Sequence, residues 1–182
     1  MLVRQLMTTP VVLCTPWDTA RAAAELMKVH GVGALPVVSD LSDPLLEGIV
    51  TDRDLCCGAL ASGSACEVTL VSEVMTPIPV TCESDSRLED CLELMRENQV
   101  RRIPVVNEWA RCIGIVSQAD IARHAPGVEL AATIREISAP TKRLRSMSLD
   151  RRYFYCGQSH ELDQIALLKR RRQPASREEM HT

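Results

Sequence analysis

Aromatic residues and long apolar runs are scarce in this sequence. Phe, Trp and Tyr together make up 3% of the 182 residues, whereas hydrophobic residues in total reach 46%, so the core must be aliphatic. No apolar run approaches the ~20 residues that span a bilayer. Arg4 and Gln5 break the N-terminal stretch, and no apolar signal-peptide core follows them. We therefore expect a cytoplasmic protein that does not associate with membranes.

Zinc-binding spacings and catalytic motifs are also missing. The eight cysteines are Cys14, Cys56, Cys57, Cys66, Cys82, Cys91, Cys112 and Cys156. No two of them form a C-x-x-C pair, and most occupy apolar positions, where cysteine acts as a small hydrophobic residue. Asp52 with Asp54, and Asp120 with His124, offer too few ligands for a metal. No nucleophile with a neighbouring base and no glycine-rich phosphate loop is present, so we predict no metal site, no cofactor and no enzyme.

Charge is distributed unevenly along the chain. The net charge is −3, but residues 1–139 contain 19 acidic and 11 basic residues, whereas residues 140–182 contain 5 and 10. An acidic body argues against nucleic acid as the main partner, and only the basic tail is suited to an anionic one. For this tail we keep three alternatives: a solvated segment, a dimer contact, or binding to an anionic partner.

The sequence instead contains one pattern twice. Met7-Thr8, Glu25-Leu26-Met27, Pro36-Val37-Val38 and Gly48-Ile49-Val50-Thr51 recur as Met75-Thr76, Glu93-Leu94-Met95, Pro104-Val105-Val106 and Gly114-Ile115-Val116-Ser117. The offset is 68 residues up to Pro104 and 66 at Gly114, which predicts a two-residue insertion in the first copy around residues 40–44. A unit duplicated once predicts two half-domains packed about a pseudo-two-fold axis. The cleft between them is a natural site for a small molecule.

Each copy is predicted to fold as β-α-β-β-α, which gives an α+β protein with α/β-type layers. The short runs 10–14 and 78–82 predict the first strands, and Asp18 and Ser86 are the predicted N-caps of the helices that follow. Apolar residues then recur at helical spacing, as Ala20, Ala23, Ala24 and Met27 and as Leu88, Cys91, Leu92 and Met95. The predicted hairpin strands are 35–38 with 48–50 and 103–106 with 113–116, and the second helices begin at Thr51 and Ser117.

The predicted domain boundaries follow from the repeat. Repeat 1 spans residues 1–62, a linker spans 63–70, and repeat 2 spans 71–126. A flanking helix is predicted over 127–139, and the basic C-terminal tail covers 140–182.

With these motifs in this order, the chain resembles a tandem CBS (cystathionine-β-synthase) domain pair, or Bateman module, and is similar to small bacterial stand-alone CBS proteins. The resemblance rests on Val74-Met75-Thr76-Pro77, Arg102-Ile103-Pro104-Val105-Val106 and Gly114-Ile115-Val116-Ser117 with Asp120, and on their counterparts in repeat 1. It covers about residues 1–125. It implies a regulatory module that binds AMP, ADP, ATP or S-adenosylmethionine and forms a homodimer; the sequence does not identify a protein partner.

The resemblance assigns ligand contacts to the start of each second helix. A hydroxyl at a helix N-terminus suits a phosphate, and a carboxylate three residues later can accept ribose hydroxyls. These residues are Ser117 with Asp120 and Thr51 with Asp54. The alternative is that each pair only caps its helix.

Two arginines distinguish the copies. Arg101 and Arg102 precede Pro104, where repeat 1 has Gly33 and Ala34, and guanidinium groups bind phosphate bidentately. We therefore predict a phosphate and ribose site formed by Arg101, Arg102, Ser117 and Asp120, and a weaker site at Thr51 and Asp54. The alternative for the arginines is a solvated loop.

The adenine requires a flat apolar slot, which the resemblance places at Pro10, Val11, Ile78 and Pro79. These four residues are equally suited to ordinary strands and turns. The predicted function is a non-catalytic regulatory module that binds an adenine nucleotide between the repeats. The alternative is a structural dimerisation scaffold with empty clefts.

Overall fold

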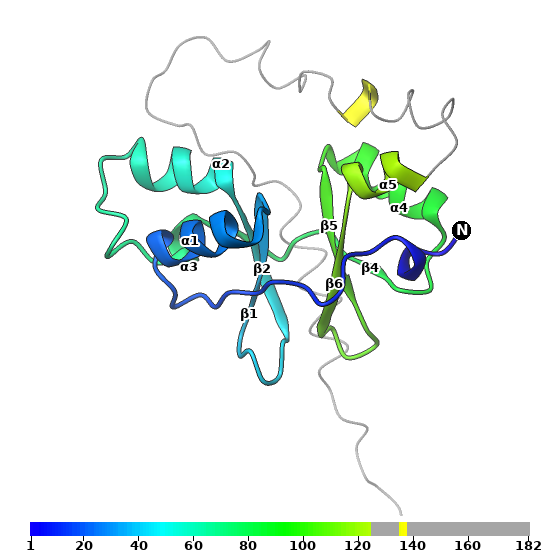
Figure 1. Cartoon of the computed structure of the whole chain (residues 1–182), viewed down its shortest axis with the longest axis horizontal. Helices are drawn as coiled ribbons and strands as arrows, with labels where there is room; N and C mark the ends of the chain where they lie inside the picture. Colours follow the sequence, from blue (N-terminus) through cyan, green and yellow to red (C-terminus); the bar gives the residue numbers. More distant parts are fainter. Residues whose placement is uncertain (125–134, 138–182) are drawn as a thin grey trace, which may run out of the picture. The chain divides into compact units, whose positions relative to one another are not determined.

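The structure is a computed structural model that describes residues 1–124 and 135–137 (Figure 1). Its elements are, in order, η1 (Val3–Gln5), α1 (Ala20–His30), β1 (Ala34–Val38), β2 (Leu46–Thr51), α2 (Asp52–Asp54), the π-helix η2 (Leu55–Leu60), α3 (Val71–Val74), β3 (Thr76–Pro77), β4 (Cys82–Glu83), α4 (Leu88–Asn98), β5 (Arg102–Val106), β6 (Cys112–Ser117) and α5 (Gln118–His124). None of the described helices is both long and apolar enough to cross a membrane. The predicted tail and all of the predicted flanking helix except residues 135–137 lie outside the described residues.

Two three-stranded sheets, each with helices packed beside it, confirm the predicted α+β fold (Figure 1). β1 pairs with β2 and β5 pairs with β6, both antiparallel. The two hairpins share one register, because Ala34 faces Thr51 in the first and Arg102 faces Ser117 in the second. The duplicated sequence therefore folds into duplicated hairpins.

The first strand of each copy is shorter than predicted. In repeat 1 only Cys14 forms a bridge, parallel to Val37, and in repeat 2 β4 has two residues, parallel to β5. Pro10 and Pro79 contribute to the shortening of these strands, because proline has no N–H to donate to a sheet ladder.

The predicted N-caps of α1 and α4 are wrong by one residue. The N-cap of α1 is Thr19, whose side chain accepts a hydrogen bond from the Ala22 N–H, and the N-cap of α4 is Arg87. The Asp18 carboxylate instead accepts the Thr15 N–H at 2.6 Å, and the Ser86 hydroxyl accepts the Glu83 N–H at 3.2 Å. Both side chains stabilise the turn before the helix and are unavailable to the helix itself.

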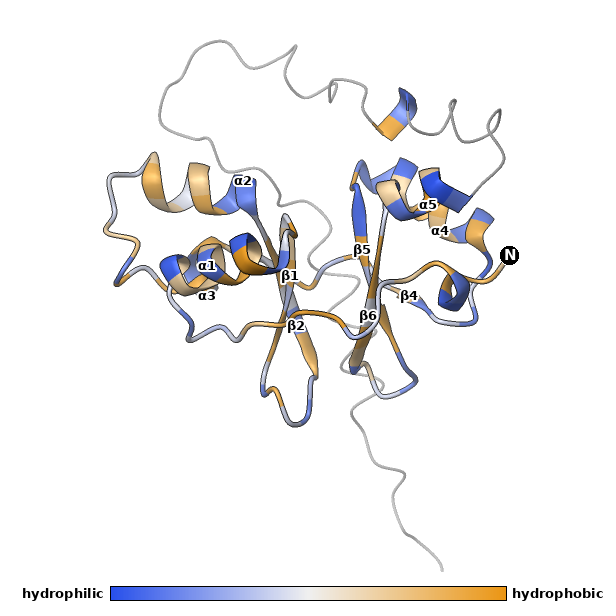
Figure 2. Ribbon diagram, in the orientation of Figure 1, coloured by the Kyte–Doolittle hydropathy of each residue, from blue (hydrophilic) through white to orange (hydrophobic). Residues whose placement is uncertain are grey.

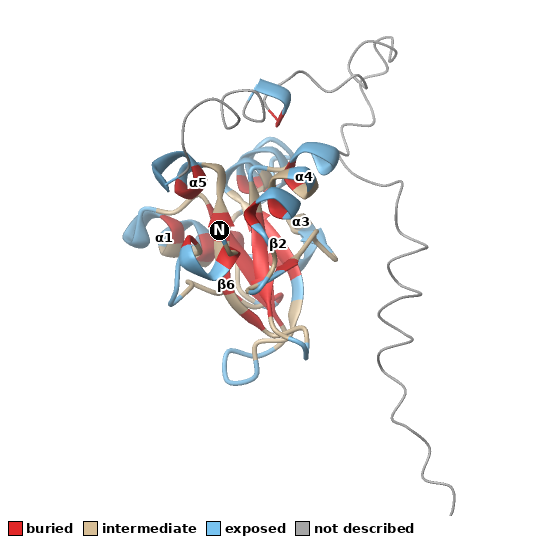
Figure 3. Ribbon diagram, turned by 90° about the vertical axis from the view of Figure 1, so that its right-hand side faces the viewer, coloured by how far each residue is buried: buried red, intermediate tan, exposed pale blue. Residues whose placement is uncertain are grey.

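The cores are aliphatic, as the scarcity of aromatic residues predicts. Strand β1 is buried along its whole length, and β5 is buried everywhere except at its first residue, Arg102. Hydrophobic residues colour much of the strands (Figure 2), and the strands form the buried centre of the described part (Figure 3). Leu35, Val37 and Val50 are fully buried in repeat 1, and Ile103 and Val105 are fully buried in repeat 2.

The segment that leads into each repeat packs on the other repeat. Val3 and Leu6 belong to the hydrophobic core of repeat 2, and the Thr8 N–H donates to the Ile115 carbonyl at 2.8 Å. Reciprocally, Val71 lies in the core of repeat 1, and β3 pairs with β2. The two copies are therefore interlocked by an exchange of segments.

The loop with the two extra residues forms a second link between the copies. The Cys112 N–H donates to the Pro44 carbonyl at 2.8 Å, and the Leu46 N–H donates to the Ala110 carbonyl at 3.1 Å. Arg111 also forms an ion pair with Asp43. The insertion thus joins the turns of the two hairpins.

Candidate functional site

In repeat 1, Thr51 and Asp54 form a closed hydrogen-bonded pair at the start of α2. The Asp54 N–H donates to Thr51 Oγ1 at 3.2 Å, while the Thr51 N–H and hydroxyl donate to Asp54 Oδ2 at 2.8 and 2.7 Å. This capping box satisfies N–H groups that have no partner within the helix. No partner of Asp54 Oδ1 is found among the described residues, and the side chain is half-buried, so this oxygen can accept a further hydrogen bond.

In repeat 2, Ser117 and Asp120 form the same pair with one difference. The Ser117 N–H and hydroxyl donate to Asp120 Oδ2 at 2.9 and 2.5 Å. Asp120 Oδ1 accepts a hydrogen bond from Arg123 Nη2 at 2.5 Å, and Asp120 is only 7% exposed. Both oxygens of this carboxylate are thus engaged by the chain itself.

Three of the predicted phosphate-site residues meet where β5 begins and β6 ends. Arg102 faces Ser117 across the hairpin, and the Gln118 N–H donates to the Arg101 carbonyl at 2.9 Å. Arg101 is exposed and Arg102 is half-buried. Neither arginine has an ion-pair partner within residues 1–124 and 135–137, so both guanidinium groups are available to an anion.

The Arg102 side chain extends across to repeat 1. A Cβ atom built on Gly33 would lie 3.0 Å from Arg102 Nη2 and 3.0 Å from Asp52 Oδ2. The Asp52 N–H also donates to the Gly33 carbonyl at 3.3 Å. A cationic group from one repeat and a carboxylate from the other therefore share the space beside Gly33, next to Thr51. Sequence reasoning missed this arrangement: it noted Gly33 only as the place where repeat 1 lacks an arginine.

The four residues predicted to hold the adenine lie where the chain crosses between the copies. Pro10 and Val11 fall between the Thr8 bridge to β6 and the Cys14 bridge to β1. Ile78 and Pro79 fall between β3 and β4, which pair with β2 and β5. All of them except the exposed Pro10 are half-buried. The two crossing segments are thus equivalent in the two copies.

Ile78 also has an unusual backbone. Its φ angle is +46°, a left-handed conformation that is rare for a β-branched residue. Its N–H donates to the Glu47 carbonyl at 3.0 Å, which holds it there. Such strain concentrates at ligand sites.

One buried donor near Ser117 has no acceptor in the described part of the chain. The side-chain amide nitrogen of Gln118, the first residue of α5, has no hydrogen-bond partner among the described residues. Most buried polar groups are paired, so this nitrogen can donate to an acceptor outside the described chain. Nothing in the sequence pattern singled out Gln118.

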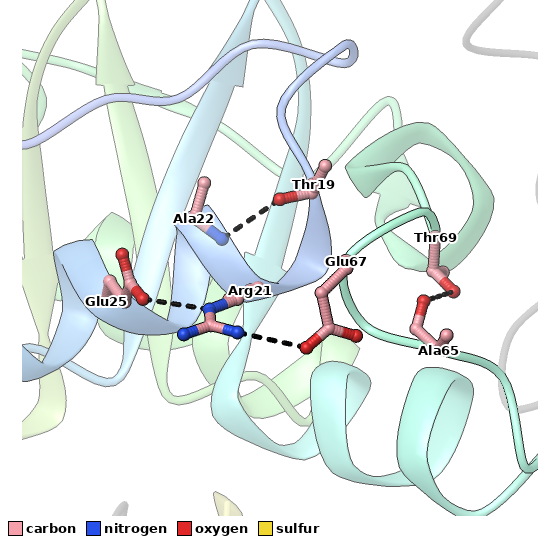
Figure 4. A network of polar contacts seen from close by, with 7 residues as sticks. All are labelled: Thr19, Arg21, Ala22, Glu25, Ala65, Glu67 and Thr69. Carbon is pink, nitrogen blue, oxygen red and sulfur yellow. Dashed lines mark hydrogen bonds and ion pairs between the residues drawn. The ribbon is translucent and has the colours of Figure 1, made fainter.

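A pocket of about 310 Å³ lies within repeat 1, between α1 and the α2–η2 helices, and Asp52 belongs both to it and to the space beside Gly33. It is lined by Ala20, Arg21, Ala24, Met27, Asp52, Leu55, Cys56, Leu60 and Cys66. At its edge, Arg21 donates to Glu25 and Glu67 at 3.1 and 3.0 Å (Figure 4). The hydrogen bonds to these carboxylates raise the pKa of Arg21. None of the predicted ligand residues lines this pocket.

A metal site finds no support in the described part of the chain. Within residues 1–124 and 135–137, no three His, Cys, Asp or Glu side chains lie close enough together to hold an ion.

These features define a class of protein: a duplicated α+β module whose copies exchange their leading segments and carry paired polar sites at the ends of their hairpins. The sequence profile of the CBS domain matches residues 3–57 and 71–127. The chain therefore belongs to the CBS domain family, as a tandem pair.

Known proteins resemble the chain over the pair. Hypoxic response protein 1 of Mycobacterium tuberculosis is 35% identical over 137 residues, which is 75% of this chain and 94% of that protein. Its crystal structure with two coordinated zinc ions has a TM-score of 0.62 and 36% identity, and covers 69% of this chain and all of the other.

Two similar structures contain adenosine compounds. CBSX2 in complex with AMP has a TM-score of 0.59 and 30% identity, over 68% of this chain and 95% of CBSX2. The CBS pair of MJ0100 in complex with 5′-methylthioadenosine and S-adenosyl-L-methionine has a TM-score of 0.61 and 28% identity, over 68% and 94%.

Proposed function

We propose that this chain is a non-catalytic regulatory module that binds an adenosine ligand between its two repeats. The candidates are AMP, ADP, ATP and S-adenosylmethionine. The observation that carries the proposal is the approach of Arg102 and Asp52 beside Gly33. There the Arg102 guanidinium of repeat 2, which has no ion-pair partner among the described residues, lies near the Asp52 carboxylate of repeat 1.

In the proposed site the phosphate binds Arg102 and the ribose binds Asp54. Arg102 has no ion pair among the described residues, and a guanidinium binds phosphate through two parallel hydrogen bonds. Asp54 Oδ1 remains available for a ribose hydroxyl, whereas the Asp120 carboxylate is engaged by Ser117 and Arg123. The grouping of Arg101, Arg102, Ser117 and Asp120 in one stronger site stays a prediction, and we favour the composite site over it.

The adenine is proposed to lie against the crossing segments. Val11, Ile78 and Pro79 are half-buried. They lie between the bridges that pair each crossing segment with strands of the two sheets. The strained backbone of Ile78 supports this position. The adenosine compounds in CBSX2 and in the MJ0100 pair support the ligand class.

The charge of the site favours a ligand with few phosphates. Asp52 lies beside Arg102, and Asp54 is next to Thr51, so each added phosphate meets carboxylate repulsion. AMP is therefore expected to bind more tightly than ATP.

Thermal unfolding of the full chain with each of AMP, ATP and S-adenosylmethionine tests the proposal. A ligand at ~100 times its dissociation constant stabilises the folded state by about 2.7 kcal/mol. Arg102→Ala and Asp54→Asn are expected to remove this gain. Arg53→Ala is the matched control, because Arg53 is an exposed residue of the same helix, α2, and has no part in the proposed site.

Two outcomes would contradict the proposal. If no adenosine ligand shifts the unfolding temperature, the alternative function of a scaffold with empty clefts is favoured. If the shift survives both substitutions, the ligand binds elsewhere. Release of phosphate or pyrophosphate from ATP by the protein would contradict its non-catalytic character.

We further propose that the protein forms a homodimer through the pocket of repeat 1. Ala24 and Cys56 are exposed at this apolar pocket, and Leu60 is 63% exposed. Sedimentation equilibrium is expected to detect a dimer that Leu60→Asp dissociates. Val68→Asp is the control, because Val68 is exposed but does not line the pocket. A dimer that tolerates Leu60→Asp would overturn this proposal.

A further inference from the structure

Two thiols meet inside repeat 2. Cys82 of β4 and Cys91 of α4 have their sulfur atoms 4.0 Å apart. Cys82 is 5% exposed and Cys91 is fully buried. In a disulfide the sulfur atoms are ~2.05 Å apart, so about 2 Å of approach separates this pair from a bond.

The other copy lacks the pair. Cys14 occupies the position of Cys82 in the repeat, but the equivalent of Cys91 is Ala23. Ala23 is fully buried in the core of repeat 1, as Cys91 is in repeat 2. Alanine therefore suffices for packing at this position. The second sulfur gives repeat 2 a pair of neighbouring thiols that repeat 1 does not have.

The segment between the two cysteines is held by the N-terminus of the chain. The Val3 N–H donates to the Ser86 carbonyl at 3.0 Å, and the Arg4 N–H donates to the Ser84 carbonyl at 2.9 Å. The Leu88 N–H donates to the Met1 carbonyl at 3.0 Å. These bonds fix residues 84–88 in the fold, so the folded protein itself keeps the two sulfur atoms together.

We propose that Cys82 and Cys91 are a redox-active pair that a hydroperoxide oxidises to an intramolecular disulfide. The thiolate of one cysteine attacks the peroxide, which breaks the O–O bond and yields a sulfenic acid and hydroxide. The second thiol, on losing its proton, attacks the sulfenic sulfur and displaces hydroxide. In total, two thiols and one hydrogen peroxide give one disulfide and two waters.

A hydrogen bond couples the two thiols. The hydrogen bond that the Cys82 thiol donates lowers the pKa of Cys91. The same hydrogen bond, followed by burial, raises the pKa of Cys82. A thiolate is the nucleophilic form of cysteine, and the hydrogen bond between the two thiols helps one sulfur of the pair to lose its proton.

The disulfide would tie β4 directly to α4. β4 directly follows the crossing segment with Ile78 and Pro79, so oxidation would restrict the end of that segment. The thiol pair does not depend on the proposed ligand, and its test below uses no nucleotide.

The test treats the full chain with hydrogen peroxide, blocks remaining thiols with N-ethylmaleimide in denaturant, and digests it with trypsin and a Glu-specific protease. Cys82 then lies in the peptide of residues 74–83 and Cys91 in that of residues 90–93. Mass spectrometry is expected to find these two peptides joined, and dithiothreitol is expected to separate them.

The controls come from the repeat itself. Cys91→Ala copies the natural residue of repeat 1, so it is expected to fold, as circular dichroism would verify, and to lose the link. Cys14→Ala is expected to keep it. When the protein is oxidised in urea, the proportion of disulfides that join Cys82 to Cys91 is expected to be at least tenfold lower than in the folded protein. The proposal is overturned if the native protein retains both alkylatable thiols after peroxide, or if Cys82 is found joined to Cys56, Cys57 or Cys66.

Discussion

Met75 lies directly over Gly48, and this contact ties a motif of one repeat to a motif of the other. A Cβ atom on Gly48 would lie 2.7 Å from the Met75 sulfur and 3.0 Å from the Thr76 carbonyl oxygen. The relation recurs at Gly114, where a Cβ atom would lie 2.8 Å from the Met7 sulfur. The Met-Thr and Gly-Ile-Val motifs therefore recur together because each Met-Thr pair rests on the glycine of the opposite copy.

Replacing Gly48 by alanine is expected to destabilise the fold. The added methyl group would overlap Met75 and the Thr76 backbone, and overpacking of this kind costs about 1–3 kcal/mol. Urea unfolding monitored by circular dichroism would measure the loss in the free energy of unfolding.

A double-mutant cycle with Met75→Ala is the control for this prediction. Part of the overlap disappears when the Met75 side chain is shortened, so the two substitutions are expected to be non-additive. Simple additivity of the two free-energy changes would mean that the methyl group does not meet Met75.

The repeat shows which residues are equivalent, but it does not show on which copy they pack. The β1–β2 and β5–β6 hairpins and the pairing of Thr51 with Asp54 follow from local patterns, and the sequence predicts them. The sequence around Val3 and around Val71 is compatible with packing on their own copy and equally with packing on the other copy. The exchange was therefore not predictable from one sequence.

The candidate site was predictable in part for the same reason. The chemistry of Arg102 as a phosphate ligand is evident from its side chain and its place before Pro104. Its extension towards Gly33 and Asp52 depends on how the copies pack, which only the structure shows. The pairs that cap helices were identifiable because their bonds join residues three positions apart.

The hydroxyls of Thr51 and Ser117 are expected to contribute to stability without any ligand. Each accepts an N–H bond from the first turn of its helix and donates to the Asp three residues on. Replacing either by alanine should cost about 0.5–2 kcal/mol, measured by urea unfolding of the ligand-free protein. Ser72→Ala, at an exposed position in α3, is the control and should have little effect. A loss seen only with ligand present would contradict the capping role.

Gly33→Ala is expected to weaken binding of the ligand while leaving the free energy of unfolding nearly unchanged. The new methyl group would lie 3.0 Å from the Arg102 guanidinium and the Asp52 carboxylate, which are ends of flexible side chains that can move aside. The unfolding free energy should change by less than about 1 kcal/mol. The proposed ligand should bind about tenfold more weakly, or about 1.4 kcal/mol, because Arg102 is displaced. Isothermal titration with AMP measures this, and unchanged affinity would contradict the composite site.

The buried thiol of Cys14 is expected to make the fold less stable in alkaline solution. Burial, followed by the nearby charge of Asp18, raises the pKa of Cys14 from 9.0 to about 12. Above pH 9 the unfolded chain loses this proton while the folded chain retains it, so the free energy of unfolding falls as pH rises towards 12. One site lowers the free energy of unfolding by at most about 1.4 kcal/mol per pH unit in this range, and this decline is absent below pH 9.

Urea unfolding at pH 8, 9 and 10.5 should show a shallower decline for Cys14→Ala than for the native chain. Cys57→Ala, at an exposed position, is the matched control and should follow the native decline. Parallel declines for Cys14→Ala and the native chain would mean that the Cys14 thiol ionises equally in the folded and unfolded states.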